Sequence, residues 1–284
     1  MLNKEYYCLI AGLPDLFFDE NKTTVNIPSF RKELKHQINL PDFKLVEYLF
    51  FLFDNQNLLN IVFNKDTSNS VPGNLSIKEL EFQLSPENEK PELPGYMLRF
   101  LNWIKRNDTT ELFPEAENKL NTLYYEYALD CPNNFLRQWF GFELNLKNIL
   151  TASNCLKFNY DLGTHLLKVY ENSEVYALLI NNKLKASYFE EHIPFHEEIF
   201  KIADFELELI EKEKAIDKLK WNYLEENTAF HYFTIEKILA YTIKLLLVKR
   251  WSTLDKATGI KLLNKLVDEL TESYAFPGEF SITK

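Results

Sequence analysis

The chain has 284 residues, 46% of them hydrophobic, and a formal net charge of −10. This composition excludes disorder over most of the length and provides enough apolar material for one large core or two to three smaller modules. Both common glycine-rich phosphate-binding motifs are missing from the sequence. The acidic charge argues against a surface that tracks nucleic acid phosphates or an anionic membrane. We therefore expect no nucleic acid partner and no cofactor.

The three cysteines, Cys8, Cys131 and Cys155, are far apart and form no C-x-x-C motif. Such a pattern is typical of reduced, buried thiols in a cytoplasmic protein. The first residues of the chain lack the long apolar core of a signal peptide. No apolar run approaches the roughly 20 residues that a membrane-spanning helix needs. These features predict a soluble, cytoplasmic protein.

The first predicted module covers residues 1–64. Its apolar run at 6–11 fits either a strand or a buried helix, because so short a run has no decisive period. Apolar periodicity then predicts helices over 30–37 and 42–63. Residues 65–95 have the composition of turns and loops, and we expect them to connect two modules. Within them, Ser76 and Glu79 have the spacing of a capping box that opens a short helix.

The second predicted module covers residues 96–187. Its first helices are expected over 98–105 and 114–129, the latter ending before Pro132. Asn133 or Asn134 is expected to cap the long helix that follows, because a short polar side chain at this position can accept the first free backbone N–H groups. A further pair of helices is expected over 161–170 and 173–179.

The third predicted module covers residues 188–284, with helices over 197–223, 233–251 and 259–270. In the first of these helices, polar residues fill the positions between the apolar ones, which predicts a solvated face. That face consists of Glu211, Lys212, Glu213, Lys214, Asp217 and Lys218. Strand signals are few throughout, so the sequence predicts an all-α fold, or one that is mostly α.

Two segments carry nearly the same five residues, 57–61 (NLLNI) and 145–149 (NLKNI), each after an aromatic run and a carboxylate. Self-similarity within a chain is the signature of repeated structural modules. We therefore expect both copies to lie on core helices of repeated helical modules.

The carboxylates and the first asparagines of these segments are candidate structural residues: Asp54 with Asn57, and Glu143 with Asn145. Short polar side chains are unfavourable in the middle of a helix because they compete for backbone hydrogen bonds. The alternatives are incidental solvent exposure and a hydrogen bond to a neighbouring helix that fixes its register. The recurrence favours the second, and neither pair indicates catalysis.

A metal site is the one catalytic alternative that the sequence offers. His192 and His196 are four residues apart and are flanked by glutamates, a combination that can hold zinc or iron. Pro194 interrupts any helix across both histidines, so we favour a helix start with carboxylates in its first turn. The sequence around His36, His165 and His231 contains no motif of a nucleophile and its base. We therefore predict a protein with no catalytic and no metal-binding residues.

Short words of this chain resemble the C-type central-stalk subunit of A/V-type rotary ATPases, which is called d-type in eukaryotic V-ATPases. Residues 54–58 (DNQNL) and 142–146 (FELNL) are similar to a word on its core helices, and 240–251 (AYTIKLLLVKRW) resemble a late phrase. Nearly the whole chain is also similar to a bacterial family of uncharacterised proteins that accompany V-type ATP synthase components. That second likeness is carried by residues 11–16 (AGLPDL), 53–59 (FDNQNLL), 134–139 (NFLRQW) and 217–222 (DKLKWN).

The resemblance implies three helical modules around a pseudo-threefold axis and a funnel-like body that transmits torque without chemistry of its own. Its partners would be the other ATPase subunits, namely the soluble central shaft and the membrane c-ring. The protein would lie at the inner face of the cell membrane, held there through protein contacts only. A stand-alone helical scaffold protein and a metal-dependent hydrolase using His192 and His196 remain the alternatives.

The chain departs from the pattern of the C-type central-stalk subunit at several polar positions. The family's carboxylates after Ala-Tyr are Leu246 and Val248 here, its asparagine after arginine is Trp251, and the arginine late in the second repeat is Thr151. Polar contacts of those family residues are therefore not expected in this chain. Two further residues of the late phrase join the candidate register residues, Tyr241 and Arg250.

Overall fold

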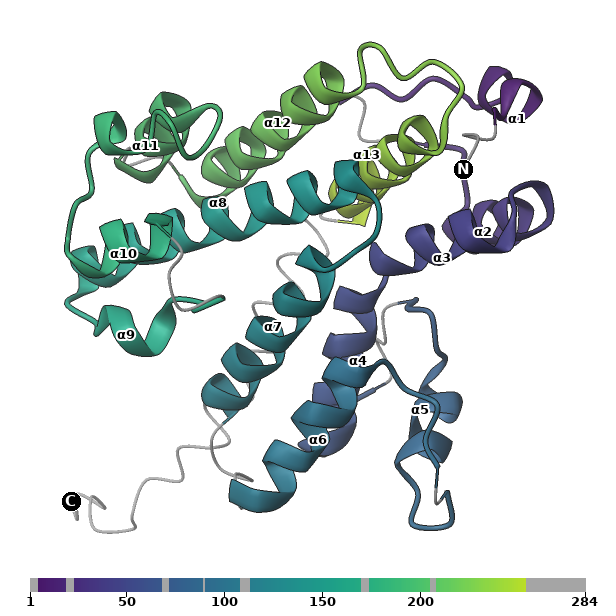
Figure 1. Cartoon of the computed structure of the whole chain (residues 1–284), viewed down its shortest axis with the longest axis horizontal. Helices are drawn as coiled ribbons and strands as arrows, with labels where there is room; N and C mark the ends of the chain where they lie inside the picture. The colour runs from purple at the N-terminus through teal and green to yellow at the C-terminus, as the bar shows by residue number, and fades with distance from the viewer. Residues whose placement is uncertain are drawn as a thin grey trace, which may run out of the picture.

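The computed structural model describes residues 5–18, 23–67, 72–88, 90–107, 113–169, 174–204 and 208–253. Within these ranges the regular structure consists of α-helices and one short 3-10 turn, with no strand, so the predicted all-α fold is confirmed (Figure 1). The elements are α1 (Tyr7–Ala11), α2 (Ile27–Gln37), α3 (Leu40–Tyr48), α4 (Phe51–Val62), α5 (Ile77–Leu84), α6 (Gly95–Asn107), α7 (Phe113–Leu129), α8 (Asn134–Phe158), α9 (Leu162–His165), α10 (Glu174–Ile180), η1 (Ala186–Tyr188), α11 (His196–Asp204), α12 (Leu209–Asn227) and α13 (Ile235–Thr253).

Local capping chemistry sets several helix starts. The side chain of Ser76 accepts from the Glu79 N–H and the Glu79 carboxylate accepts from the Ser76 N–H, so the predicted capping box is present at α5. Asn133, the first of the two predicted candidates, caps α8 by accepting from the Leu136 N–H at 3.0 Å. The ambiguous run at 6–11 is helical and forms α1.

Two predicted helices are divided in the structure. The one expected over 42–63 forms α3 and α4, with the buried residues Leu49 and Phe50 in the turn between them. The one expected over 197–223 forms α11 and α12, and residues 205–207 between them lie outside the described part. The helix predicted over 259–270 also lies outside the described residues.

The helix expected over 161–170 is shorter than predicted. It is the single turn α9, which Asp161 caps, and the backbone is already extended at Leu166. The reason is tertiary: the backbone groups of Leu167 are hydrogen-bonded to a side chain of α8 and are not available for a helix.

The long helix α8 is the centre of the fold (Figure 1). In this view α12 lies above it, α7, α4 and α6 lie below it, α9 to α11 lie at one end, and α1 to α3 lie beyond the other. Direct packing joins α8 to α7 and α11, α4 to α7, and α13 to α3. Phe140 of α8 is fully enclosed, as are Phe50 before α4 and Tyr124 of α7.

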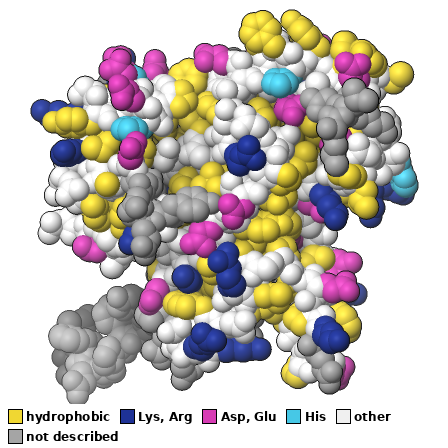
Figure 2. Space-filling model, in the orientation of Figure 1, with side chains coloured by type: hydrophobic (Ala, Val, Ile, Leu, Met, Phe, Trp, Pro, Cys, Tyr) yellow, Lys and Arg dark blue, Asp and Glu magenta, His cyan; other side chains and the backbone are white. Residues whose placement is uncertain are grey.

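One hydrophobic core runs through residues of all three predicted modules, including Leu58, Leu136 and Leu239. The boundaries near residues 64, 95 and 187 stay a prediction, but the buried core crosses each of them. Figure 2 shows charged side chains of both signs scattered over one face, with hydrophobic side chains visible between the groups of helices. Among the described helices, none is long and apolar enough to span a bilayer.

The cysteine prediction needs one correction. Cys131 and Cys155 are buried free thiols, as expected, but Cys8 is exposed. Its helix α1 is short and buries only Leu9, so the cysteine beside that leucine points away from the core.

Candidate functional site

Asp54 of α4 is the centre of a buried polar cluster. Its side chain is 1% exposed and accepts hydrogen bonds from the Leu75 N–H at 3.0 Å and from Asn74 Nδ2 at 2.8 Å. Arg31 of α2 donates to the Gly73 carbonyl at 2.5 Å and to Asn74 Oδ1 at 2.7 Å. Burial raises the pKa of the Asp54 carboxyl, while the hydrogen bonds and Arg31 oppose that rise. These hydrogen bonds hold residues 73–75 of the connecting segment against α2 and α4.

Two asparagines in and just before the first repeated segment are also buried. Asn57 is 1% exposed within α4. Asn55, which the sequence does not single out, is buried beside it and accepts a 2.7 Å hydrogen bond from the Tyr96 hydroxyl of α6. This bond links the first and second predicted modules inside the core.

The second repeated segment presents a different residue to the core. Asn145 is only half-buried, whereas Asn148 is 3% exposed. Asn148 donates from Nδ2 to the Leu167 carbonyl and accepts from the Leu167 N–H, both at 2.9 Å. The two segments are therefore not structurally equivalent, because Asn57 and Asn148 occupy different positions of the shared word. The paired bonds to Leu167 make Asn148 the register residue of this segment.

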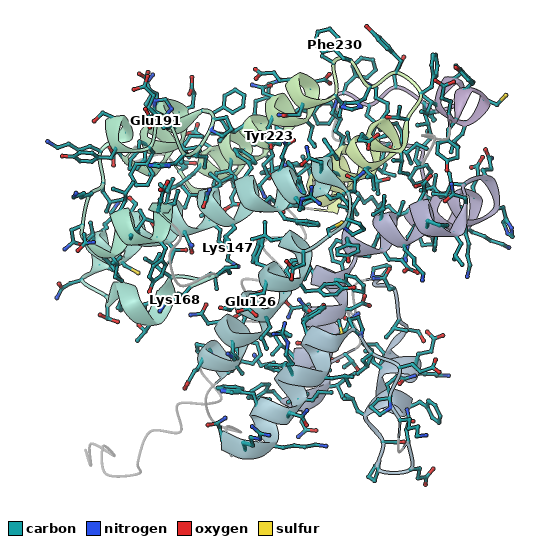
Figure 3. The ribbon with its side chains drawn as sticks, viewed as in Figure 1. Glu126, Lys147, Lys168, Glu191, Tyr223 and Phe230 are labelled. Carbon is teal, nitrogen blue, oxygen red and sulfur yellow. The ribbon has the colours of Figure 1, made fainter. Side chains whose placement is uncertain are left out.

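Glu143 of α8 forms an ion pair with Lys220 of α12, with 2.8 Å between Oε1 and Nζ. Burial disfavours the ammonium, but the attraction of Glu143 outweighs burial and raises the pKa of Lys220. In the same interface Tyr223 of α12, labelled in Figure 3, stacks on Phe142 of α8, with ring centroids 4.1 Å apart. Ion pair and ring stack together fix how α12 lies on α8.

Arg250 of α13 binds a buried carboxylate of α12. Its Nη1 donates to both oxygens of Asp217, at 2.9 and 3.1 Å, and Nη2 pairs with Glu213. The Trp251 indole also donates to Asp217, at 2.8 Å. Asp217 is fully buried, so its predicted place on a solvated face is wrong. Two donors from α13 draw it inward, and burial raises the pKa of its carboxyl despite the attraction of Arg250.

Tyr241 makes a packing contact. Its ring lies 5.5 Å from that of Phe30, centroid to centroid, and so joins α13 to α2. In the described part of the protein the buried Tyr241 hydroxyl has no hydrogen-bond partner. Burial raises the pKa of Tyr241 to about 12, with a smaller contribution from Asp15.

Sequence reasoning missed a contact between the start of α8 and the start of α13. Asn133, besides capping α8, donates from Nδ2 to the Glu236 carboxylate at 2.9 Å. Glu236 lies in the first turn of α13 and also accepts from Thr234. The available signal is a glutamate in the first turn of a predicted helix, which does not reveal its partner in a distant helix.

Among the residues that the structure describes, the two histidines of the metal alternative belong to no group that could hold a metal ion. His192 Nδ1 lies 3.1 Å from the Glu174 carboxylate of α10, and His196 is the first residue of α11. Within the described ranges no three His, Cys, Asp or Glu side chains are placed so that they could hold an ion. The polar residues described above form hydrogen bonds and ion pairs that hold helices in fixed positions.

Residues 3–274 match a protein-family model described as "Protein of unknown function (DUF2764)". The match covers most of the chain, so the protein belongs to this family. Comparison with curated proteins and comparison with solved structures find no match.

Proposed function

We propose that this protein is a non-catalytic central-stalk subunit of a V/A-type ATPase, which couples the soluble central shaft to the membrane c-ring during proton or sodium transport. Its partners are then other ATPase subunits, and it lies at the inner face of the membrane through protein contacts. The proposal starts from the resemblance of residues 54–58, 142–146 and 240–251 to words of the C-type central-stalk subunit.

The observation that carries the proposal is that polar contacts join every pair of the three predicted modules. The Tyr96 hydroxyl donates to Asn55 at 2.7 Å, between the second module and the first. The Glu143–Lys220 pair joins the second to the third at 2.8 Å. The backbone N–H of Tyr6 donates to the Phe233 carbonyl at 2.7 Å, between the first and the third.

Such contacts suit a part that transmits force. Buried hydrogen bonds and ion pairs between helices fix one geometry among them, so that a force on one helix is passed to the next. Three of these contacts involve residues of the segments that resemble the C-type central-stalk subunit. Asp54 binds the connecting segment, Glu143 binds α12, and Arg250 binds Asp217. Each of them stiffens the body without providing a reaction centre.

Affinity purification of the chain, tagged at its own gene and extracted in mild detergent, tests the proposal. We expect the catalytic, shaft and c-ring subunits of a V/A-type ATPase to co-purify in fixed ratio to the tagged chain. An unrelated tagged protein from the same cells is the control. Recovery of the chain without any ATPase subunit would contradict the proposal and favour the stand-alone scaffold.

A further inference from the structure

A cavity of about 580 Å³ lies where α4, α7, α8, α12 and α13 converge. This volume falls within the range of roughly 300–1,000 Å³ that is usual for small-molecule sites. Its walls are mainly apolar. They include Phe50, Leu52 and Phe53 at the start of α4, Trp139 and Phe140 of α8, and Leu246 of α13. Apolar surface left in contact with water is unfavourable, so an apolar occupant would stabilise this region.

The buried charged groups of the wall already have partners inside the protein, and Lys249, which also lines the cavity, is exposed to solvent. Glu143 is paired with Lys220 at 2.8 Å, and Asp217 accepts from Arg250 and Trp251. A charged ligand would lose its hydration, and the buried charges among the described lining residues are already paired, which makes its burial costly. The Lys220 ammonium has three N–H donors. Only one is needed for Glu143, so an uncharged oxygen of a ligand could accept from another.

We propose that this cavity binds an uncharged, hydrocarbon-rich small molecule. The half-buried side chains of Leu52, Phe53 and Leu246 contact its apolar body, and Lys220, beside Glu143, donates to at most one neutral oxygen. The inference rests on the cavity itself and holds whether or not the protein belongs to an ATPase.

Two fluorescent probes with the same ring system test both parts of the proposal. N-phenyl-1-naphthylamine is uncharged, and 8-anilinonaphthalene-1-sulfonate differs from it by an anionic sulfonate. Titrated into the full chain, the uncharged probe is expected to bind saturably at one site per chain. The anionic probe should bind at least ~10-fold more weakly. Binding to the folded state alone should also raise the melting temperature with the uncharged probe.

Substitutions that fill the cavity locate the site. Leu246→Trp and Leu52→Trp place a large ring in it from different helices, at half-buried positions. Each should weaken binding of the uncharged probe by at least ~10-fold. Leu98→Trp is the matched control, because Leu98 is a half-buried leucine of α6 that does not line the cavity. The control should bind like the wild type.

Three results would overturn the proposal: no saturable binding of the uncharged probe, equal affinity for the anionic probe, or undiminished binding in a folded Leu246→Trp variant. Circular dichroism and the melting temperature establish whether each variant is folded. Should both cavity variants fail to fold, the wild type decides. A melting temperature that the uncharged probe leaves unchanged would then overturn it.

Discussion

Glu143 of α8 and Lys220 of α12 lie 2.8 Å apart, oxygen to nitrogen, with 13% and 21% of their side chains exposed. Removing the lysine leaves a carboxylate without its counter-charge in a largely buried place. We therefore expect Lys220→Met to reduce the free energy of unfolding by about 3 kcal/mol. Urea unfolding at pH 7 measures the loss.

A double variant and an exposed pair serve as controls for this prediction. Lys220→Met combined with Glu143→Gln removes both charges and should be more stable than Lys220→Met alone. Lys201→Met breaks an exposed pair with Glu197 within α11 and should change stability by no more than about 0.5 kcal/mol. Equal losses in Lys220→Met and Lys201→Met would show that the pair between α8 and α12 has no special weight.

Gly73 should not tolerate a side chain. A Cβ atom at this position would collide with the Asp54 carboxylate, reaching within 2.8 Å of its Cγ. Because Asp54 is held by Asn74 and Leu75, we expect Gly73→Ala to destabilise the protein by about 1–3 kcal/mol. Thermal unfolding compares it with Gly95→Ala, whose Cβ would meet nothing within 4 Å. Similar stability of the two variants would contradict the account of the Asp54 cluster.

The two asparagines of the second repeated segment should differ sharply. Asn148→Leu leaves the N–H and the carbonyl of Leu167 buried without partners, and each such group costs about 1–3 kcal/mol. Asn145→Leu alters a half-buried side chain and should stay within about 0.5 kcal/mol of the wild type. Hydrogen exchange of the Leu167 amide gives a local measure, since it should accelerate in Asn148→Leu only. Equal effects of the two substitutions would refute the assignment of the register role to Asn148.

Glu236 should make stability depend on pH in the acid range. Burial alone would raise the pKa of its carboxyl, but hydrogen bonds from Thr234, from its own backbone N–H and from Asn133 outweigh burial and lower the pKa below 4.5. Between the folded and unfolded pKa values the unfolded chain binds more protons. The contribution of Glu236 is therefore present above about pH 4.5 and lost as the pH falls through the lower, folded pKa.

The test compares Glu236→Gln with Glu198→Gln in urea unfolding at a series of pH values. Both glutamates lie in the first turn of a helix, but Glu198 is exposed. Glu236→Gln should lower stability at pH 7 by about 1–2 kcal/mol and flatten the pH dependence below pH 4.5. Glu198→Gln should retain the wild-type pH dependence. An unchanged profile in Glu236→Gln would show that this carboxylate is not stabilised by the fold.

Local chemistry explains which structural features the sequence could predict. The periodicity of apolar residues locates most helices, and the capping box at Ser76 and the cap at Asn133 follow from side-chain reach within three residues. The α9 turn is shorter than predicted because Asn148, a residue of another helix, takes the backbone groups of Leu167. A hydrogen bond between two separate elements leaves no sign in the local sequence of either one.

The same limit applies to the candidate site. Asp54, Glu143 and Arg250 are recognisable as polar residues in apolar helices, and all three make buried or half-buried contacts. Their partners are not recognisable, because Asp217 and Lys220 look like ordinary charges on an amphipathic helix until α13 and α8 pack against it. The shared five-residue sequence does not determine which asparagine faces the core, because the buried face of each helix depends on the helices that pack against it.

The most direct test of the proposed coupling role is ATP-driven ion uptake by inverted membrane vesicles from cells that lack this gene. A coupling subunit without chemistry of its own should be required for uptake but not for ATP hydrolysis by the soluble head. We predict that uptake is lost in the deletion vesicles, that the released head still hydrolyses ATP, and that re-expression of the chain restores uptake. Undiminished uptake in vesicles without the protein would contradict the central claim.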